Sequence, residues 1–274
     1  MNETSYIKAL DSTAKQTEPA IRKTLEWLRL PKGSKVLDVP CGTGNHMKWM
    51  LEAYPDTHIT GVDIAREHVQ YAKSKLNQAG KGGSCQFTVG DMNNLEFDNN
   101  TFDLVWCCDG LWPGPKEVGC PAEQPYDILN HMVRVTKPGG KIAILFWSSQ
   151  RLLPGYPKIE AALNNSDYAL RPWSEKQSPE MHFTYTPVWL KKIGLNNIQV
   201  KTFAADIKAP ENQLEKEGLQ LLFDMFWGES EAQVSKEIWK KFKNLTNPRS
   251  DEFILNNESY AGILTYTMYT GIVP

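Results

Sequence analysis

The sequence has no long apolar run, no basic excess and no pair of cysteines in Cys-x-x-Cys spacing. Its longest strongly apolar run covers residues 142–147, which is far too short to span a bilayer. The 274 residues include 30 basic and 32 acidic side chains, whereas a dedicated nucleic-acid-binding protein usually carries a basic excess. We therefore expect neither membrane insertion nor a nucleic acid partner, and the oligomeric state stays open.

The five cysteines are odd in number and scattered, with Cys107 and Cys108 adjacent. Neither the cysteines nor the five histidines have the spacing of metal ligands, so we expect no metal site. Residues 1–11 lack the basic and apolar regions of a secretory signal. These features predict a reduced, cytoplasmic protein.

Strand and helix patterns alternate through the first 150 residues, in a chain of ordinary globular composition. This alternation predicts an α/β fold with a parallel, doubly wound sheet, whose ligand site lies at the carboxyl ends of the strands. The expected strands are 35–39, 58–63, 84–89, 102–108 and 141–147. The expected helices are 19–30, 45–54, 65–79 and 126–135, and residues 137–140 are expected to turn into the fifth strand.

The rhythm changes after residue 150. Residues 148–184 are rich in Pro, Ser, Tyr and Trp and show no long period, whereas 212–245 have a largely helical pattern. A short helix over 186–193 and strands over 197–203 and 260–273 are also expected. One face of the later helical segment is expected to be core. The residues of that face are Leu214, Leu221, Leu222 and Met225.

A glycine-bearing turn is the most informative segment. The sequence LDVPCGTG (37–44) runs from a strand into a helix, with Asn45 as the expected N-cap. Glycines in such a turn let the backbone approach a ligand. Asp63 closes the second strand, where a carboxylate can bind ribose hydroxyls, and Asp91 follows the third, where it can accept from an adenine amino group.

With these residues the sequence resembles the class I S-adenosylmethionine-dependent methyltransferases, in the small-molecule group of the ubiquinone and menaquinone C-methyltransferases. The segments that carry the resemblance stand in the family's order and cover about residues 20–150. They are LDVPCGTG (37–44), GVDIA (61–65), VGDMNNLEF (89–97), FDLVWCCDG (102–110) and RVTKPGGKIAIL (134–145). The resemblance implies a Rossmann-like sheet of seven strands with the last strand antiparallel, supplied by 260–273. It also implies S-adenosylmethionine as cofactor and S-adenosylhomocysteine as product.

The resemblance further implies a cofactor site at the carboxyl ends of the strands. Asp38 and the turn would lie against the methionine part, Asp63 would bind both ribose hydroxyls, and Cys108 would line the methionine side through its backbone. The turn residues concerned are Val39, Pro40, Gly42 and Gly44. Ile64 would pack on the adenine, Asp91 would face its amino group, and Met92 would flank the ring.

Two residues of this segment stand apart. Pro40 occupies a position where the family usually has glycine, and proline has no backbone N–H, so a cofactor contact through that N–H is excluded. His46 follows the glycines closely. It is either a contact of the methionine carboxylate or a solvated helix residue.

We expect residues 1–274 to form a single methyltransferase domain with inserted segments. Its core would comprise 17–147, 186–207 and 260–273, and its cap would comprise 148–185 and 208–259. The cap is rich in aromatic residues and close to neutral, which suits a small, partly apolar organic substrate. The acceptor atom, whether O, N or C, stays open.

Methyl transfer from a sulfonium requires alignment more than a reactive side chain, so no catalytic residue is assigned. Asp109, after the fourth strand, is a candidate for orienting a substrate or a simple turn former. His182 is a candidate base, with packing of a lid as the alternative. Trp112, Arg151 and Tyr6 are candidate substrate contacts. Their alternatives are a packing tryptophan, a surface arginine and an untethered terminus.

Other functions compete with this interpretation. A nicotinamide-dependent dehydrogenase requires Gly-x-Gly-x-x-Gly or Ala, but Gly42 and Gly44 are followed by Met47 at the third position. A non-catalytic S-adenosylmethionine-binding protein would carry the same motifs and stays open. A nucleic-acid methyltransferase is disfavoured by the net charge of −2 and by the loop after the fourth strand.

Overall fold

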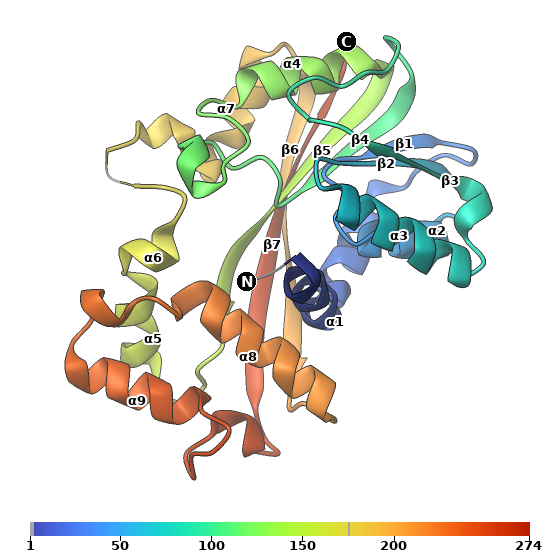
Figure 1. The fold of residues 1–274 in the computed structure, drawn as a ribbon. Coiled ribbons are helices and arrows are strands. Elements are labelled where there is room, and N and C mark those ends of the chain that lie inside the picture. The colour runs from blue at the N-terminus through green and yellow to red at the C-terminus, as the bar shows by residue number, and fades with distance from the viewer. Residues whose placement is uncertain (1–2, 175) are drawn as a thin grey trace. The chain divides into compact units, whose positions relative to one another are not determined.

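A single twisted sheet organises the chain. The computed structural model describes residues 3–174 and 176–274 (Figure 1). Within these residues the sheet has seven strands in the order β3-β2-β1-β4-β5-β7-β6, and the pairs from β3 to β5 are parallel. The strands are β1 (Lys35–Asp38), β2 (His58–Asp63), β3 (Cys85–Val89), β4 (Phe102–Cys108), β5 (Thr136–Arg151), β6 (Asn196–Lys208) and β7 (Ala261–Ile272).

Strand β7 runs antiparallel to β5. Near one end of the pair, the Gly139 N–H donates to the Val273 carbonyl and the Val273 N–H donates to the Gly140 carbonyl. Further along, the Ser148 hydroxyl lies 3.0 Å from that of Thr265. Residue numbers therefore rise along β5 as they fall along β7. The predicted fold class, a Rossmann-like α/β sheet with an antiparallel last strand, is confirmed.

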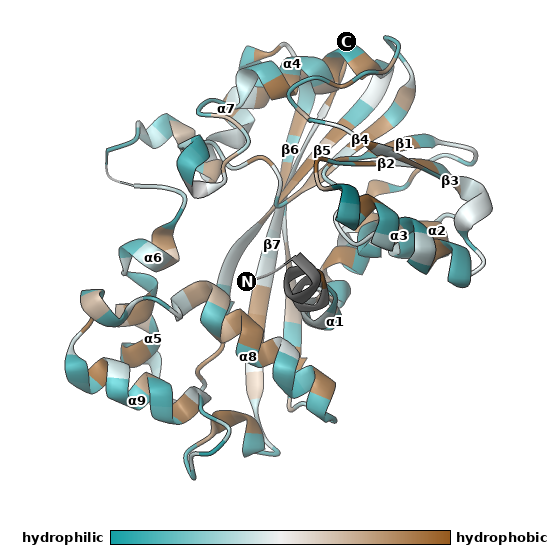
Figure 2. Cartoon of the chain, in the orientation of Figure 1, coloured by the Kyte–Doolittle hydropathy of each residue, from teal (hydrophilic) through white to brown (hydrophobic). Residues whose placement is uncertain are grey.

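The chain divides into two compact units, of which the first holds most of the sheet. This sheet unit comprises residues 21–147, 176–203 and 266–274. Its helices are α2 (Asn45–Ala53), α3 (Arg66–Gln78), α4 (Tyr126–Val135) and α7 (Thr186–Lys192). Its core joins the apolar residues of β4 and β5 to the buried face of α4, formed by Ile128, Leu129 and Met132. Figure 2 shows the contrast between the apolar strands and the hydrophilic exposed side of α3.

The second, helical unit comprises residues 3–20, 148–174 and 204–265. Its helices are α5 (Pro157–Asn164), α6 (Asp167–Leu170), α8 (Gln213–Trp227) and α9 (Lys236–Thr246). Buried aromatic rings form its core, with the rings of Trp227 and Phe242 centred 5.9 Å apart. Helix α1 (Glu3–Leu28) and strands β5, β6 and β7 contribute residues to both units.

Helix α8 presents a different face to the core from the predicted one. Leu214 is 66% exposed and Met225 is 46% exposed, whereas Phe223 and Trp227 are fully buried. Gly218 allows the chain to come close on the buried side, because a Cβ there would lie 2.5 Å from the carbonyl oxygen of Ser12. The aromatic side chains and this close approach orient the helix. Leu222 is therefore buried as predicted and Leu221 is half-buried, whereas the prediction was wrong for Leu214 and Met225.

Three other predictions about local structure were wrong at their ends. Helix α1 begins at Glu3 rather than at residue 19 and includes Pro19. Residues 137–140 lie inside β5, because the backbone of Gly139 and Gly140 pairs with Val273. Gly44, not Asn45, holds the cap position of α2.

No helix within residues 3–174 and 176–274 combines the length and the apolar character needed to cross a membrane.

Replacing Gly218 by alanine is expected to destabilise the protein by about 1–3 kcal/mol, because the new Cβ would meet the backbone of Ser12. Helix propensity alone would favour alanine by about 1 kcal/mol, so the two effects have opposite signs. Urea unfolding measures the difference. Leu214→Ala, on the exposed side of the same helix, is the control and should change stability by less than about 0.5 kcal/mol. A stabilised Gly218→Ala variant would contradict the close approach of the two backbones.

Candidate functional site

The residues predicted to bind the cofactor gather where β1, β2 and β4 end. Asp38 is the last residue of β1, Asp63 is the last of β2, and α2 begins directly after the glycine turn. Strand β1 pairs in parallel with both β2 and β4, so their carboxyl ends share one edge of the sheet. The sheet topology thus brings together residues that are far apart in the sequence.

The glycine turn has the left-handed backbone that glycine favours. Gly42 has a φ of 49° and Gly44 a φ of 75°. The Cys41 N–H donates to the Val62 carbonyl at 2.8 Å, which ties the turn to β2. Gly44 also lies against α3, because a Cβ there would come within 3.0 Å of Ala72.

Pro40 fits this turn because the chain opposite it has no side chain. A Cβ on Gly110 would lie 2.1 Å from Pro40 Cδ. The Val39–Pro40 peptide bond is cis. The ring of Pro40 therefore occupies space that Gly110, in the loop after β4, leaves open.

Asp38 carries the least satisfied polar group of the site. It is fully buried, and neither carboxylate oxygen has a hydrogen-bond partner among the described residues. Burial, and then the charge of Asp63, raise its pKa well above the ordinary value. A buried carboxylate of this kind is stabilised by a ligand that brings a positive charge or N–H donors.

Trp106 adds an unsatisfied donor beside this acceptor. Trp106 of β4 pairs with Asp38 of β1 in the parallel register of these two strands. The indole N–H of Trp106 is buried and has no hydrogen-bond partner in the part of the chain that the structure describes. The two orphaned groups fit the polar methionine part of the predicted cofactor, which has both cationic and anionic groups.

Asp63 organises the turn through its carboxylate. Oδ2 accepts a hydrogen bond from the Gly42 N–H at 2.8 Å, and Oδ1 accepts one from the Ala65 N–H at 2.9 Å. His68 Nδ1 lies 3.3 Å from Oδ1. Each carboxylate oxygen can accept a second hydrogen bond, so the geometry leaves capacity for ribose hydroxyls.

The residues predicted to contact the adenine differ in exposure. Ile64 is 71% exposed, which makes it an available apolar surface for a flat ring. Asp91 is exposed, and its Oδ1 accepts hydrogen bonds from the Asn93 backbone N–H and side-chain amide. Met92 is 8% exposed and belongs to the hydrophobic core.

His46 lies in the first turn of α2 against aromatic rings. Its ring is centred 5.6 Å from that of Trp49 and 6.0 Å from that of Trp106. Burial lowers the pKa of His46 to about 4. The imidazole is neutral at pH 7, so any contact with a carboxylate is made through a neutral N–H.

Asp109 follows β4 and binds two other strands. Its Oδ1 accepts the Trp147 backbone N–H at 2.7 Å, and its Oδ2 accepts the Tyr266 hydroxyl at 2.8 Å. Asp109 is solvent-exposed on one side, yet the protein around its carboxylate raises its pKa by desolvation to about 6. The Cys108 thiol lies 3.8 Å from Oδ2, and burial raises the pKa of that thiol, which stays protonated.

Tyr266 is a residue that sequence reasoning missed. It lies in β7 and is 4% exposed. Only the pairing of β7 with β5 brings it to the end of β4, and no sequence spacing signals that neighbourhood. The strand itself was predicted, but its register was not.

His182 and Trp112 lie in one aromatic cluster of the sheet unit. The ring of Trp112 is centred 4.7 Å from Phe146 and 5.5 Å from Phe183. His182 contacts Phe183, and its Nδ1 lies 2.8 Å from the Thr184 hydroxyl. Burial lowers the pKa of His182. This aromatic cluster consists of Trp112, Phe146, Phe183 and His182.

The remaining two candidates lie elsewhere. Arg151 is the last residue of β5, in the helical unit; it is exposed, and its guanidinium donates to the Gln150 carbonyl at 2.9 Å. The backbone of Tyr6 lies in α1, but its side chain is outside the described ones.

Among the residues that the structure describes, no group of three or more His, Cys, Asp and Glu side chains is arranged to hold a metal ion.

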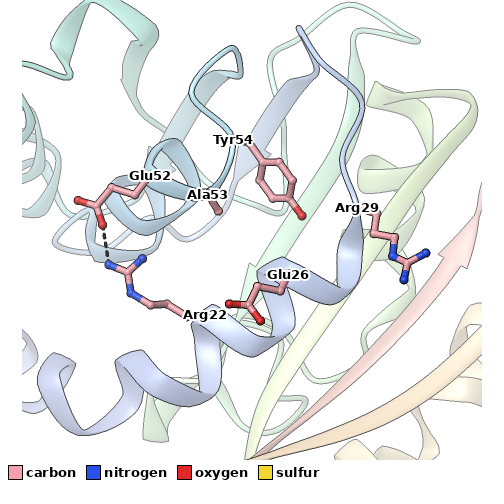
Figure 3. Close-up of a pocket in the computed structure, with 6 residues that line it drawn as sticks. All are labelled: Arg22, Glu26, Arg29, Glu52, Ala53 and Tyr54. Atoms are coloured by element: carbon pink, nitrogen blue, oxygen red, sulfur yellow. Dashed lines mark hydrogen bonds and ion pairs between the residues drawn. The ribbon is translucent and has the colours of Figure 1, made fainter.

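A pocket of about 370 Å³ lies away from the predicted site (Figure 3). It opens between the end of α1 and the end of α2, where the Arg22 guanidinium pairs with Glu52 at 2.5 Å. The glycine turn lies at the other end of the nine-residue α2, about 13 Å away. The residues that line the pocket are Arg22, Glu26, Arg29, Glu52, Ala53 and Tyr54.

Similarity to known proteins covers the glycine turn and the strands around it. The family described as a methyltransferase domain matches residues 36–140. The demethylmenaquinone methyltransferase of Listeria welshimeri is 31% identical over 139 residues, which are 50% of this chain and 55% of that protein. Phosphoethanolamine N-methyltransferase 1 of Triticum aestivum is 32% identical over 141 residues, 52% of this chain and 26% of that protein. The chain thus spans about half the length of the first of these curated relatives and less of the second.

The fold has solved counterparts. A structure of a SAM-dependent methyltransferase from Aquifex aeolicus matches with a TM-score of 0.53 and 18% sequence identity, covering 100% of both chains. At this identity the likeness concerns the fold, and it agrees with the sheet order and the antiparallel last strand described above.

Replacing Gly110 by alanine is expected to destabilise the protein by about 1–3 kcal/mol, because the new Cβ would overlap the ring of Pro40. Pro40→Gly should recover most of this loss in the double variant, even though glycine alone costs about 0.4–1 kcal/mol through the unfolded chain. A double-mutant cycle by urea unfolding measures the coupling. Gly83→Ala is the control, since a Cβ there meets no atom within 4 Å. Additive effects of the two substitutions would refute the contact.

Proposed function

We propose that this chain, whose residues 36–140 are a methyltransferase domain of the class I S-adenosylmethionine-dependent kind, transfers a methyl group to a small, partly apolar organic molecule. The observation that carries the proposal is the buried, unpartnered carboxylate of Asp38 beside the glycine turn. A binding site for a ligand with a cationic amino group explains why the Asp38 carboxylate is buried there despite its cost in desolvation free energy.

Each part of the cofactor has proposed partners in the sheet unit. Asp38 and the turn from Val39 to Gly44 hold the methionine part, and His46 contacts its carboxylate as a neutral donor. Asp63 binds the ribose hydroxyls while it holds the turn through Gly42. The proposed adenine contacts are Ile64, Asp91 and Met92, and the backbone of Cys108 lines the methionine side.

The cofactor supplies an activated methyl group when it is bound. The chain's own task is to hold the acceptor in line and to exclude water, and such positioning alone lowers a barrier by about 7–11 kcal/mol. Pro40 takes no part through an N–H, so the neighbouring residues of the turn provide the backbone contacts.

The substrate is proposed to be small and partly apolar. The partly buried rings of Trp112, Phe183 and His182, packed beside the buried ring of Phe146, supply apolar and flat surfaces in the sheet unit. The names of the two relatives, one acting on demethylmenaquinone and one on phosphoethanolamine, show that similar domains serve different acceptors. The net charge of −2 favours such substrates over nucleic acid.

Three further proposals concern the cap, two candidate substrate contacts and the location of the protein. Segments 148–185 and 208–259 are proposed as the cap that selects the substrate. Arg151 and Tyr6 stay candidate substrate contacts. The five free cysteines support a reducing, cytoplasmic location.

Isothermal titration with S-adenosylhomocysteine, and separately with NADH, tests the cofactor. We expect binding of the first and none of the second. No binding of S-adenosylhomocysteine, or binding of NADH, would overturn the proposal. Binding without methyl transfer to any component of a cell extract would instead indicate a non-catalytic binding protein.

The variant Asp38→Asn should separate binding from stability. Because folding raises the pKa of Asp38, its ionised form destabilises the folded protein as the pH rises above the ordinary aspartate range. Asp38→Asn is therefore expected to raise the free energy of unfolding at pH 7. It should also weaken S-adenosylhomocysteine binding by about 10-fold or more, through loss of a charged acceptor. Asp56→Asn, on an exposed turn, is the matched control and should change neither quantity. An Asp38→Asn variant that binds as tightly as the wild type would refute the assigned role.

A further inference from the structure

Asp109 has an unusual backbone for a residue that serves only as a turn former. Its φ is 50°, in the left-handed region that costs a non-glycine residue about 1–2 kcal/mol. Aspartate tolerates this region best when its side chain binds its own turn. The Asp109 carboxylate instead crosses to β5 and β7, where it accepts from Trp147 and Tyr266. Strained residues with such over-determined surroundings concentrate at functional sites.

The position of Asp109 links it to the proposed cofactor site. The next residue, Gly110, packs against Pro40 of the glycine turn. Asp109 is an exposed residue, and its Oδ1 keeps a lone pair beyond the hydrogen bond that it accepts from Trp147. Tyr266 and Trp147, which both donate a hydrogen bond to Asp109, have rings centred 5.7 Å apart.

We propose that Asp109 is the general base of the methyl transfer, positioned by Tyr266, and that the acceptor is the hydroxyl of a phenol or enol. This inference rests on the proposed methyltransferase function and adds the acceptor atom and the residue that takes its proton.

The step balances without any further reagent. The acceptor oxygen forms a bond to the methyl carbon while the carbon–sulfur bond breaks, and the electron pair of that bond stays on sulfur. The hydroxyl proton passes to an oxygen of Asp109. One positive charge on sulfur and one negative charge on Asp109 are thereby cancelled, and Asp109 releases the proton to solvent after the product has left.

The electrostatics around Asp109 suit this role. The titratable groups near it are the Cys107 and Cys108 thiols from β4 and the Tyr266 phenol from β7. Burial raises the pKa of all three, so all three stay protonated and neutral. Asp109, with its pKa raised to about 6, is mostly ionised at pH 7 and is a stronger base than an ordinary aspartate.

The acceptor class follows from the need for a base. A neutral amine already presents a lone pair to the methyl group, and its extra proton can leave afterwards. A phenol or enol gains nucleophilicity as its proton leaves, so a positioned carboxylate helps it in the transition state. The partly buried ring of Trp147 is an aromatic surface that would match an aromatic acceptor.

The test uses the full chain, methyl-labelled S-adenosylmethionine and two matched probes, 1-naphthol and 1-naphthylamine, with a cell extract as a third source of acceptors. We expect O-methylation of 1-naphthol, or O-methylated product from the extract, and a rate that rises with pH through about 6. Asp109→Asn should lower kcat by about 10²–10⁴-fold and abolish that rise. Its affinity for S-adenosylhomocysteine should stay within about 3-fold of the wild type, since Asn keeps an acceptor for the Trp147 N–H.

Tyr266→Phe tests the positioning role. The Tyr266 hydrogen bond stabilises the ionised carboxylate, so its loss should shift the rise in rate to higher pH. A residue with a purely structural role would lower the amount of folded protein without moving the pH profile. Tyr269→Phe, on the same strand, is the matched control and should leave the profile in place.

Three outcomes would overturn the inference. The first is an Asp109→Asn variant whose kcat stays within about 3-fold of the wild type. The second is label found on nitrogen or carbon, whether in the naphthylamine or in the extract. The third is S-adenosylhomocysteine binding with no O-methylated product from either source. Failure of S-adenosylhomocysteine binding itself would count against the proposed function instead.

Discussion

Two backbone hydrogen bonds to the carboxylate of Asp63 hold the site together. One comes from Gly42 in the turn after β1 and the other from Ala65 at the start of α3. Because Asp63 is nearly buried, these bonds fix the spacing of two loops that would otherwise be joined only through the sheet. The left-handed glycines, the close packing of α3 and the exposed Ile64 all follow from that spacing.

The glycine turn and the strands around it were predictable from the sequence, whereas the packing of side chains was less so. Glycine at 42 and 44 marks a turn because only a residue without Cβ readily adopts its backbone, and the structure bears out the strands, the fold class and the resemblance of residues 36–140. Leu214 and Met225 were wrongly placed on the buried face of α8, because aromatic rings and the Gly218 contact orient that helix more strongly than the leucine and methionine pattern. Tyr266 was missed because strand register depends on partners distant in sequence.

Two carboxylates with raised pKa values occupy this edge of the sheet, and their surroundings differ. Asp38 is fully buried and accepts no hydrogen bond among the described residues, so it suits a permanent role in holding a charged ligand. Asp109 is an exposed residue whose carboxylate accepts hydrogen bonds from Trp147 and Tyr266, which suits the proposed role in proton transfer. Environment, more than residue type, separates a binding carboxylate from one suited to proton transfer.

The position of β7 has a consequence for how the chain assembles. Strand β7 follows every other strand in the sequence, yet it lies between β5 and β6. Strand β6 therefore has no neighbour in the sheet until β7 has been inserted, and both compact units include part of β7. During synthesis neither unit reaches its final form before these late residues leave the ribosome. Until β7 pairs with it, β6 is an exposed edge strand, and such an edge is a site for mispairing.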